Sequence, residues 1–348
     1  MKYLVLIAFL SYASLGLGQS RGDSILLSER TMDRPLNVHK GQLRVSGGYR
    51  LGLHTIRFDD EGQRLDLTDG GLSFASNTLA GEVKYGVLEF LQVSLAFAYL
   101  DQAIKKPTNY IIASGFTEVN SMDVYNGLTD LSVGLDFRAP FKNRRIDLLL
   151  SASSTLPTAD QNPALPSHSV STTSVGQSSA TSVNYQYNQA MGNGTPVVAG
   201  GLTFKYRFDN WAFTLAGSYV LPTSDVVTSY YNSQLVSGSF ENQQVFYRFQ
   251  RPEEIRAYGE VEYQLFPWFD LIGEVGYVST SGGFSEETGT RVIPEPTSLL
   301  SVGPGFEIII THRVWFRQRV ILPIAGTNST GPTNYSATVS YNLFVSNR

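Results

Sequence analysis

Alternation of apolar and polar positions is the main pattern in this sequence, and the residues between Gln92 and Tyr99 show it clearly. Large apolar side chains occupy every second position, at Val93, Leu95, Phe97 and Tyr99, with Ser94, Ala96 and Ala98 between them. A helix repeats its apolar positions every three to four residues, whereas a half-buried strand repeats them every two. The residues just before also alternate, and residues 86–89 fit a tight connection. Residues 83–99 therefore predict a β-hairpin whose apolar face contacts either a protein core or lipid.

The same period recurs along the whole chain and predicts about twelve strands, at the spacing that all-β folds favour. We expect strands near residues 42–53, 79–85, 93–99, 131–137, 146–150, 198–208, 211–219, 255–265, 271–277, 300–310, 314–322 and 335–343. The clearest hairpin joins 198–208 to 211–219 through Asp209 and Asn210.

The connections between these strands alternate between short and long without exception. Outer-membrane barrels have short periplasmic turns and longer extracellular loops, because successive connections emerge at opposite rims. The sequence therefore predicts an all-β fold: a closed, antiparallel, up-and-down transmembrane β-barrel of about twelve strands. The longest connection, residues 156–196, is rich in Ser, Thr, Gln and Asn, and loops of that length are functional or disordered.

The positions of the aromatic residues indicate whether the apolar face contacts a protein core or lipid. They recur near strand ends, as expected of the aromatic girdles at a membrane interface: Tyr85, Tyr99, Tyr206, Trp211, Tyr219, Trp268 and Tyr277. Charged residues make up only 16 % of the chain, while 19 Tyr and 20 Phe are present. The apolar face is therefore expected to contact lipid, and closure removes the unpaired edges that hydrocarbon would not tolerate.

The N-terminus and the composition indicate the compartment. Lys2, the apolar run from Leu4 to Leu10 and the small residues up to Gly18 have the layout of a cleavable secretory signal at residues 1–18. The absence of cysteine excludes a lipid-modified N-terminus and a disulfide-stapled domain. The net charge of −4 gives no reason to expect nucleic acid as a partner. Residues 19–40 lack alternation and form either a periplasmic segment or a plug, and residues 41–348 form the barrel in the cell outer membrane.

Short phrases in the middle of the chain resemble a known family. They are Val83-Lys84-Tyr85-Gly86, the segment from Asn126 to Leu135, Leu156-Pro157-Thr158 and Leu221-Pro222-Thr223. In this order, over about residues 80–225, they resemble outer-membrane β-barrels of the phenol meta-cleavage-pathway type, which are labelled transporters. The resemblance implies a transport barrel, and it implies a fold more directly than a substrate. The chain departs from such barrels at its end, because Phe344 is followed by four further residues.

Charged residues gather on the polar faces of neighbouring predicted strands, which would place them inside a barrel. The candidate lumen lining consists of Arg44, Arg50, Arg256, Glu260, Glu262, Glu274, Glu307, Arg317 and Arg319. These residues either select a solute by charge and bore or form salt bridges that fill space. A barrel of twelve strands is intermediate in width between barrels of eight strands, whose interior is filled by side chains, and barrels of sixteen strands, which enclose an aqueous channel. We therefore expect a narrow outer-membrane channel that passes a small or hydrophobic solute.

Two other classes of function are alternatives to a channel. A structural or adhesive barrel would act through its long loops, and an enzymatic barrel of lipase or protease type would carry a nucleophile and a base. The sequence has neither a Gly-x-Ser-x-Gly motif nor a His-Glu-x-x-His motif, and its four histidines lie on separate segments, with His54 the one candidate worth following. We expect no enzyme activity, catalytic residue, cofactor or metal. The expected partners are outer-membrane lipid, a small solute and the barrel-assembly machinery.

Overall fold

The computed structural model describes residues 36–67, 73–112, 115–141, 143, 145–159, 167–175, 178–188, 195–236, 239–287, 290–311 and 313–344. The expected signal at residues 1–18 lies outside the described residues. Among the described residues, no helix is long and apolar enough to cross a bilayer. Strands account for nearly all of the structure that is described.

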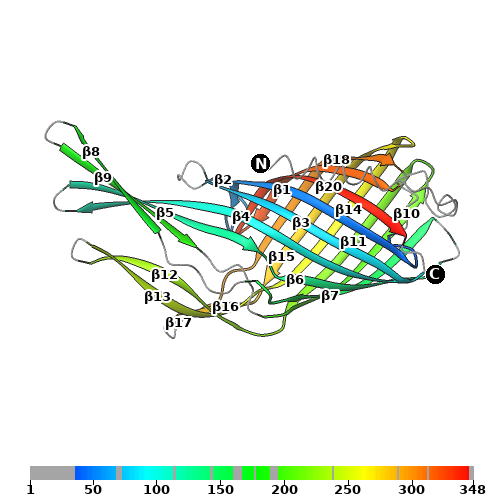
Figure 1. Ribbon diagram of the computed structural model, residues 1–348, viewed down its shortest axis with the longest axis horizontal. Helices are drawn as coiled ribbons and strands as arrows, with labels where there is room; N and C mark the ends of the chain where they lie inside the picture. The colour runs from blue at the N-terminus through cyan, green and yellow to red at the C-terminus, as the bar shows by residue number, and fades with distance from the viewer. Residues whose placement is uncertain are drawn as a thin grey trace.

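Twelve strands form a closed antiparallel barrel, as the alternation predicts (Figure 1). In barrel order they are β1(Gln42–Phe58), β3(Ser73–Leu88), β4(Leu91–Ile112), β6(Leu131–Arg138), β7(Ile146–Leu156), β10(Val197–Phe208), β11(Trp211–Pro222), β14(Glu253–Phe266), β15(Phe269–Ser281), β18(Thr297–Thr311), β19(Val314–Thr327) and β20(Ser329–Phe344). Each strand pairs with the next, and β20 pairs with β1 from Gln42↔Phe344 to Phe58↔Ser329, which closes the barrel. Every predicted strand is confirmed.

The remaining strands lie in the long connections. They are β2(Arg64–Asp66), β5(Gly115–Leu128), β8(Ser167–Val175), β9(Ser178–Asn188), β12(Val226–Val236), β13(Ser239–Gln250), β16(Phe284–Glu287) and β17(Thr290–Val292). β5 extends the barrel sheet beyond β4 and pairs in parallel with β9, while β12, β13, β16 and β17 form a separate sheet. Figure 1 shows these hairpins projecting from one end of the barrel. The connections predicted as long loops are therefore largely β-structure.

One predicted connection differs from the structure. The link between the last two barrel strands was expected to be long, but β19 ends at Thr327 and β20 begins at Ser329, with only Asn328 between them. Asn328 adopts a φ of 48°, in the left-handed region that Asn tolerates in tight turns. The sequence does not predict this hairpin, because the residues next to its turn are small and polar on both faces of the strands. Apolar and polar positions therefore no longer alternate there, although the strands remain paired.

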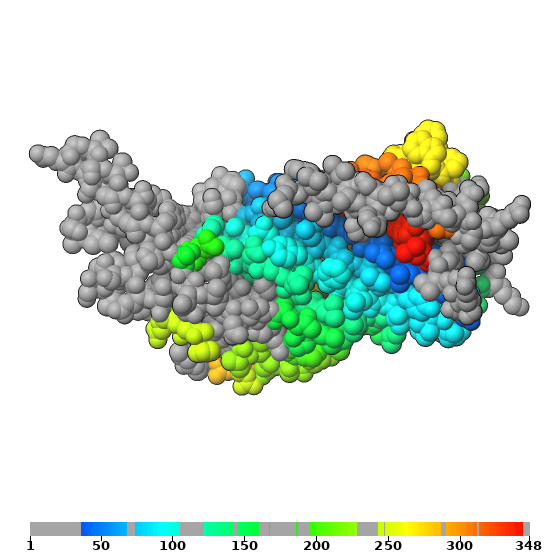
Figure 2. All heavy atoms as spheres, viewed as in Figure 1, coloured from blue at the N-terminus to red at the C-terminus, as the bar shows by residue number. Residues whose placement is uncertain are grey.

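The two faces of the barrel wall have opposite chemistry. Apolar side chains point outward and are exposed, with Leu215 62 % and Leu79 57 % accessible, whereas polar side chains such as Asp147 and Glu262 are buried inside. Near the short turns, rings contact one another around the outer rim: Trp211 lies 4.6 Å from Tyr263, and Phe269 lies 5.8 Å from Phe306, between ring centroids. Figure 2 shows β3, β4 and β6, in cyan and green, as part of the near wall. This arrangement fits hydrocarbon outside and water or polar groups inside.

The outward-facing residues allow a direct test of which face meets lipid. Phe97→Arg and Leu135→Arg, at positions 46 % and 53 % exposed on the outer wall, should each destabilise the barrel by about 2–4 kcal/mol near the bilayer midplane. Ser94→Arg and Ser132→Arg, on the lumenal face, should have much smaller effects. Folding titrations into lipid vesicles measure the four free energies, and a larger effect from the serine substitutions would contradict the assignment.

Candidate functional site

Several charged side chains on the lumenal faces of the barrel strands are almost completely buried. Asp147 is 0 % exposed, Glu262 and Glu307 are each 4 % exposed, and Glu260 is 6 % exposed. Each lies on the inward face because it occupies an alternate position of its strand, opposite to the apolar residues that face lipid. Buried charges are tolerated only where they are paired and hydrogen-bonded.

Arg317 on β19 is the centre of this buried network. Its Nε donates to Glu307 Oε2 at 2.6 Å, its Nη2 donates to Glu262 Oε1 at 2.8 Å, and its Nη1 lies 3.2 Å from Glu260 Oε2. Glu307 is its register partner on β18, while Glu260 and Glu262 are on β14, on the far side of β15 and β18. One guanidinium on β19 therefore pairs with carboxylates on both β18 and β14, and it neutralises carboxylates that would otherwise repel one another.

Arg319 extends the network toward the extracellular side. Its Nη1 donates to Glu274 Oε2 at 3.1 Å and lies 3.5 Å from the hydroxyl of Tyr258. Tyr258 donates to Glu260 and lies 3.2 Å from Glu274 Oε2. Glu260 and Glu274 are direct cross-strand partners on β14 and β15, an arrangement of like charges that is unfavourable by itself. Arg317, Arg319 and Tyr258 together hold these two carboxylates side by side.

A second cluster lies on the strands next to the first. Asp147 on β7 accepts hydrogen bonds from Arg138 Nε at 2.8 Å and from Arg207 on β10. Lys205, also on β10, donates to Glu262 Oε2 at 3.0 Å. The Asp147 cluster has two cations and one carboxylate, whereas the Arg317 cluster, with Lys205, has three cations and four carboxylates. The excess charges of the two clusters are opposite, so that together they are neutral.

The structure brings six of the nine predicted lumen residues together and leaves three elsewhere. The six are Glu260, Glu262, Glu274, Glu307, Arg317 and Arg319. Arg256 pairs with Glu254 near the extracellular end of β14, where 56 % of its side chain is exposed. Arg44 donates to Asn342 Oδ1 at 3.1 Å and lies over the ring of Trp315, while Arg50 is exposed on β1. These three residues lie outside the network, because neighbouring strands are staggered and residues on one face need not be level, and their role in lining the lumen stays a prediction.

Five members of the clusters were not among the predicted site residues. They are Arg138, Asp147, Lys205, Arg207 and Tyr258. The four charged residues could have been predicted from alternation alone, because each lies on the polar face of a strand whose other face is apolar. Tyr258 could not, since a tyrosine gives the same signal on either face of a barrel strand.

On β4, β6 and β7, the part of the lumen wall that lies to the extracellular side of the Asp147 cluster is built from small residues. Ser94 on β4, Gly134 on β6 and Ser153 on β7 are successive register partners and face inward. A Cβ at Gly134 would lie 2.5 Å from Ser94 Oγ, so a larger residue at this position would require the Ser94 side chain to rotate. These residues are partly accessible, in contrast to the buried carboxylates. Any open space in the lumen is therefore expected along this small-residue wall.

The residues just before β1 lie against the lumenal side of the barrel near its short turns. Asn37 and Val38 are 2 % and 0 % exposed. The Val38 amide donates to Gln92 Oε1 at 2.7 Å, and Asn37 Nδ2 donates to the carbonyl oxygen of Glu89 at 2.9 Å. Gly86 lets this segment approach, because a Cβ there would lie 1.9 Å from the carbonyl oxygen of His39. Residues 36–40 therefore pack against the ends of β3 and β4 near their short turn.

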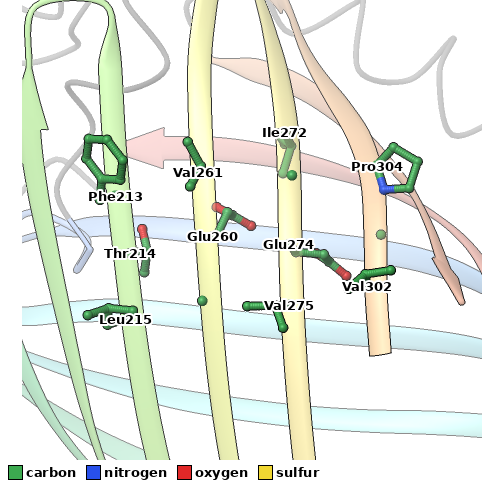
Figure 3. Close-up of a pocket in the computed structure, with 13 residues that line it drawn as sticks. Phe213, Thr214, Leu215, Glu260, Val261, Ile272, Glu274, Val275, Val302 and Pro304 are labelled. Atoms are coloured by element: carbon green, nitrogen blue, oxygen red, sulfur yellow. The ribbon is translucent and has the colours of Figure 1, made fainter. Parts of the chain in front are cut away.

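A groove of about 660 Å³ opens on the outer face of β11, β14, β15 and β18 (Figure 3). Its lining includes the outward-facing Leu215, Val261, Val275, Val302 and Pro304, together with Gly259 and Gly273. The glycines create the groove, since a Cβ at Gly273 would meet no atom within 4 Å. Figure 3 shows Glu260 on β14 and Glu274 on β15, the strands that also carry Val261 and Val275 of the groove. Only the thickness of the barrel wall therefore separates the groove from the network.

The closed wall, its apolar exterior and its charged interior define a transmembrane β-barrel of the outer-membrane type. No protein-family model matches the sequence, and no curated protein matches it either.

Solved structures share the fold. An outer membrane channel from Pseudomonas putida F1 has a TM-score of 0.58 at 12 % identity, covering 88 % of this chain and 97 % of that one. The translocator domain of autotransporter NalP from Neisseria meningitidis has a TM-score of 0.44 at 11 % identity, covering 87 % and 89 %. The CymD monoaromatic hydrocarbon channel has a TM-score of 0.44 at 10 % identity, covering 88 % of each chain. The expected likeness to outer-membrane channel barrels is thus confirmed for the fold.

The central position of Arg317 predicts an unequal response to the loss of two arginines. Arg317→Met leaves three buried carboxylates without their shared cation and should destabilise the barrel by about 3–5 kcal/mol. Arg256→Met removes an exposed pair and should change stability by about 0–1 kcal/mol. Urea unfolding from lipid vesicles measures both values, and equal effects would show that the network is not held by Arg317.

Proposed function

We propose that this protein is a narrow outer-membrane channel for a small, uncharged or apolar solute. The observation that carries the proposal is the division of the lumen into a buried, internally neutralised network and a wall of small residues. The ion pairs fill part of the cross-section of the lumen. The small residues leave the remaining part open as a path for the solute. The fold it shares with the outer membrane channel from Pseudomonas putida F1 supports the same class of function.

Electrostatics explains why an uncharged solute fits best. Inside a narrow, partly desolvated bore, Coulomb interactions are stronger than in bulk water. Each carboxylate of the network already has a cation, and a passing ion would compete with these pairs while losing its own hydration. The network therefore serves both roles expected from the sequence, since it fills space and also sets which charges pass.

The N-terminal segment forms part of the same proposal. Residues 36–40, the described part of the predicted segment, hold the periplasmic mouth through Asn37 and Val38. In this arrangement the segment reduces the bore without closing the wall. The outer-membrane lipid that contacts the apolar face and the assembly machinery that inserts the barrel are its expected partners.

Charge selectivity should respond to single substitutions in the network. Glu262→Gln or Glu274→Gln should move the reversal potential of the reconstituted protein toward that of an anion-selective channel, because each removes a negative charge from the bore. Arg317→Gln or Arg319→Gln should move it toward cation selectivity. Planar-bilayer recordings under a salt gradient measure the potential. Glu295→Gln is the control, since Glu295 bonds Asn328 near the extracellular end, and shifts as large from this variant would contradict a lumenal path.

The small-residue wall makes a second prediction, with a control one residue away. Ser153→Phe should strongly reduce single-channel conductance, because a large ring on the lumenal face of β7 would enter the path. Ala152→Phe places the same ring on the outer face and should leave conductance unchanged. If both variants conduct like the wild type, the path does not follow this wall.

A further inference from the structure

Arg50 on β1 is a charged residue of the lumenal face that the network does not include. It lies between Tyr49 and Leu51, and Tyr49 is 44 % exposed on the outer wall. Successive residues of a strand point to opposite faces, so the Arg50 side chain points into the lumen. It is exposed there, whereas the carboxylates of the network are buried. Within the part of the chain that the structure describes, Arg50 has no ion-pair partner.

The positions around Arg50 have small side chains or none. The next inward positions on its own strand are Gly48 and Gly52. Its register partners on the neighbouring strands are Thr78 on β3 and Ser336 on β20. These four residues provide hydroxyl groups at most, and none of them carries a charge that could neutralise the guanidinium. The Arg50 side chain therefore remains open to the lumen.

The network has a cation in the same cross-strand row as Arg50. Arg319 on β19 is the register partner of Ser336, so it lies two strand spacings of about 4.8 Å each from Arg50. Arg319 donates to Glu274, on the side of the network away from β1. Like charges repel, which keeps Arg50 apart from Arg319 and outside the network. The lumen thus has a neutralised cluster on one part of its wall and a separate cation on another.

The position of Arg50 relates it to the small-residue wall. Its row continues through Thr78 to Leu100 on β4. Ser94, which belongs to the small-residue wall, lies on the same strand closer to the short turn, and the inward positions between Ser94 and Leu100 are both alanines. The row of Arg50 is therefore on the extracellular side of the small-residue wall. A solute that enters from outside reaches this row first.

We propose that Arg50 is the docking residue for the solute, and that its guanidinium donates a hydrogen bond to an oxygen atom of an otherwise apolar molecule. The inference rests on the proposed channel function and specifies its solute class, which is a small uncharged molecule with a carbonyl or hydroxyl oxygen. A guanidinium has five N–H donors and no acceptor, so it binds an oxygen and gains nothing from a hydrocarbon. A hydrogen bond from a charged donor is also stronger than one between neutral groups. The apolar body of the solute then lies against the alanines and glycines of the wall.

Three probes of matched shape test this docking. Acetophenone has a carbonyl oxygen, isopropylbenzene has none, and benzoate has a carboxylate. The measurement is the concentration of each probe that halves the single-channel current in a planar bilayer, relative to the current of the same variant without probe. In the wild type, acetophenone should block at a lower concentration than isopropylbenzene.

Substitutions on β1 identify the donor. Arg50→Met should raise the half-blocking concentration of acetophenone about tenfold, as expected for the loss of one charge-assisted hydrogen bond, and should leave that of isopropylbenzene unchanged. Arg50→Lys keeps a charged donor and should fall between the wild type and Arg50→Met. The matched control is Arg57→Met, because Arg57 is exposed on the face of β1 opposite to the buried Ile56 and Phe58. It should block like the wild type with all three probes.

Three results would contradict the proposal, and each has a different meaning. If acetophenone blocks the wild type and Arg50→Met at the same concentration, the docking at Arg50 is wrong and the channel proposal stands. If benzoate blocks at a lower concentration than acetophenone, Arg50 binds anions and the uncharged solute class is wrong. If the wild type conducts no ions, the channel function fails and the docking fails with it.

Discussion

The structure depends on one constraint, which is that no backbone N–H or C=O group can remain unpaired in hydrocarbon. The ladder between β1 and β20, from Gln42↔Phe344 to Phe58↔Ser329, satisfies it by joining the ends of the sheet. Once the sheet is closed, each strand has an outer face in lipid and an inner face in a confined space. The apolar exterior and the polar interior both follow from that division.

Confinement makes the interior polar groups depend on one another. A carboxylate such as Glu262 has little water around it, so its stability comes from Lys205 and Arg317. The same geometry that stabilises these charges also fixes their positions across the lumen. In the described ladder between β18 and β19, Gly303 and Pro304 have no register partner, and the ion pair of Arg317 with Glu307 also links these two strands.

Most of the barrel could be predicted from the sequence, because alternation specifies both the strands and the face of each residue. The stagger between strands is not encoded in that way, which is why Arg44, Arg50 and Arg256 were placed in a network that they do not join. The extracellular strands were missed for a different reason: segments such as β8 and β9 are polar on both faces, so pairing leaves no period in the sequence. The groove at Gly273 depends on the absence of side chains on adjacent strands, and only the register reveals it.

The pairing of the first strand with the last also has a kinetic consequence. Gln42 and Phe344 are almost a whole chain length apart, whereas every other pair of neighbouring barrel strands is close in sequence or separated by one long connection. Closing a larger loop loses more chain entropy, and folds with many distant contacts form slowly. The hairpins can form locally, but the junction between β1 and β20 can form only after all of them are in place. Closure is therefore the last step of folding, and until then both terminal strands expose an open edge.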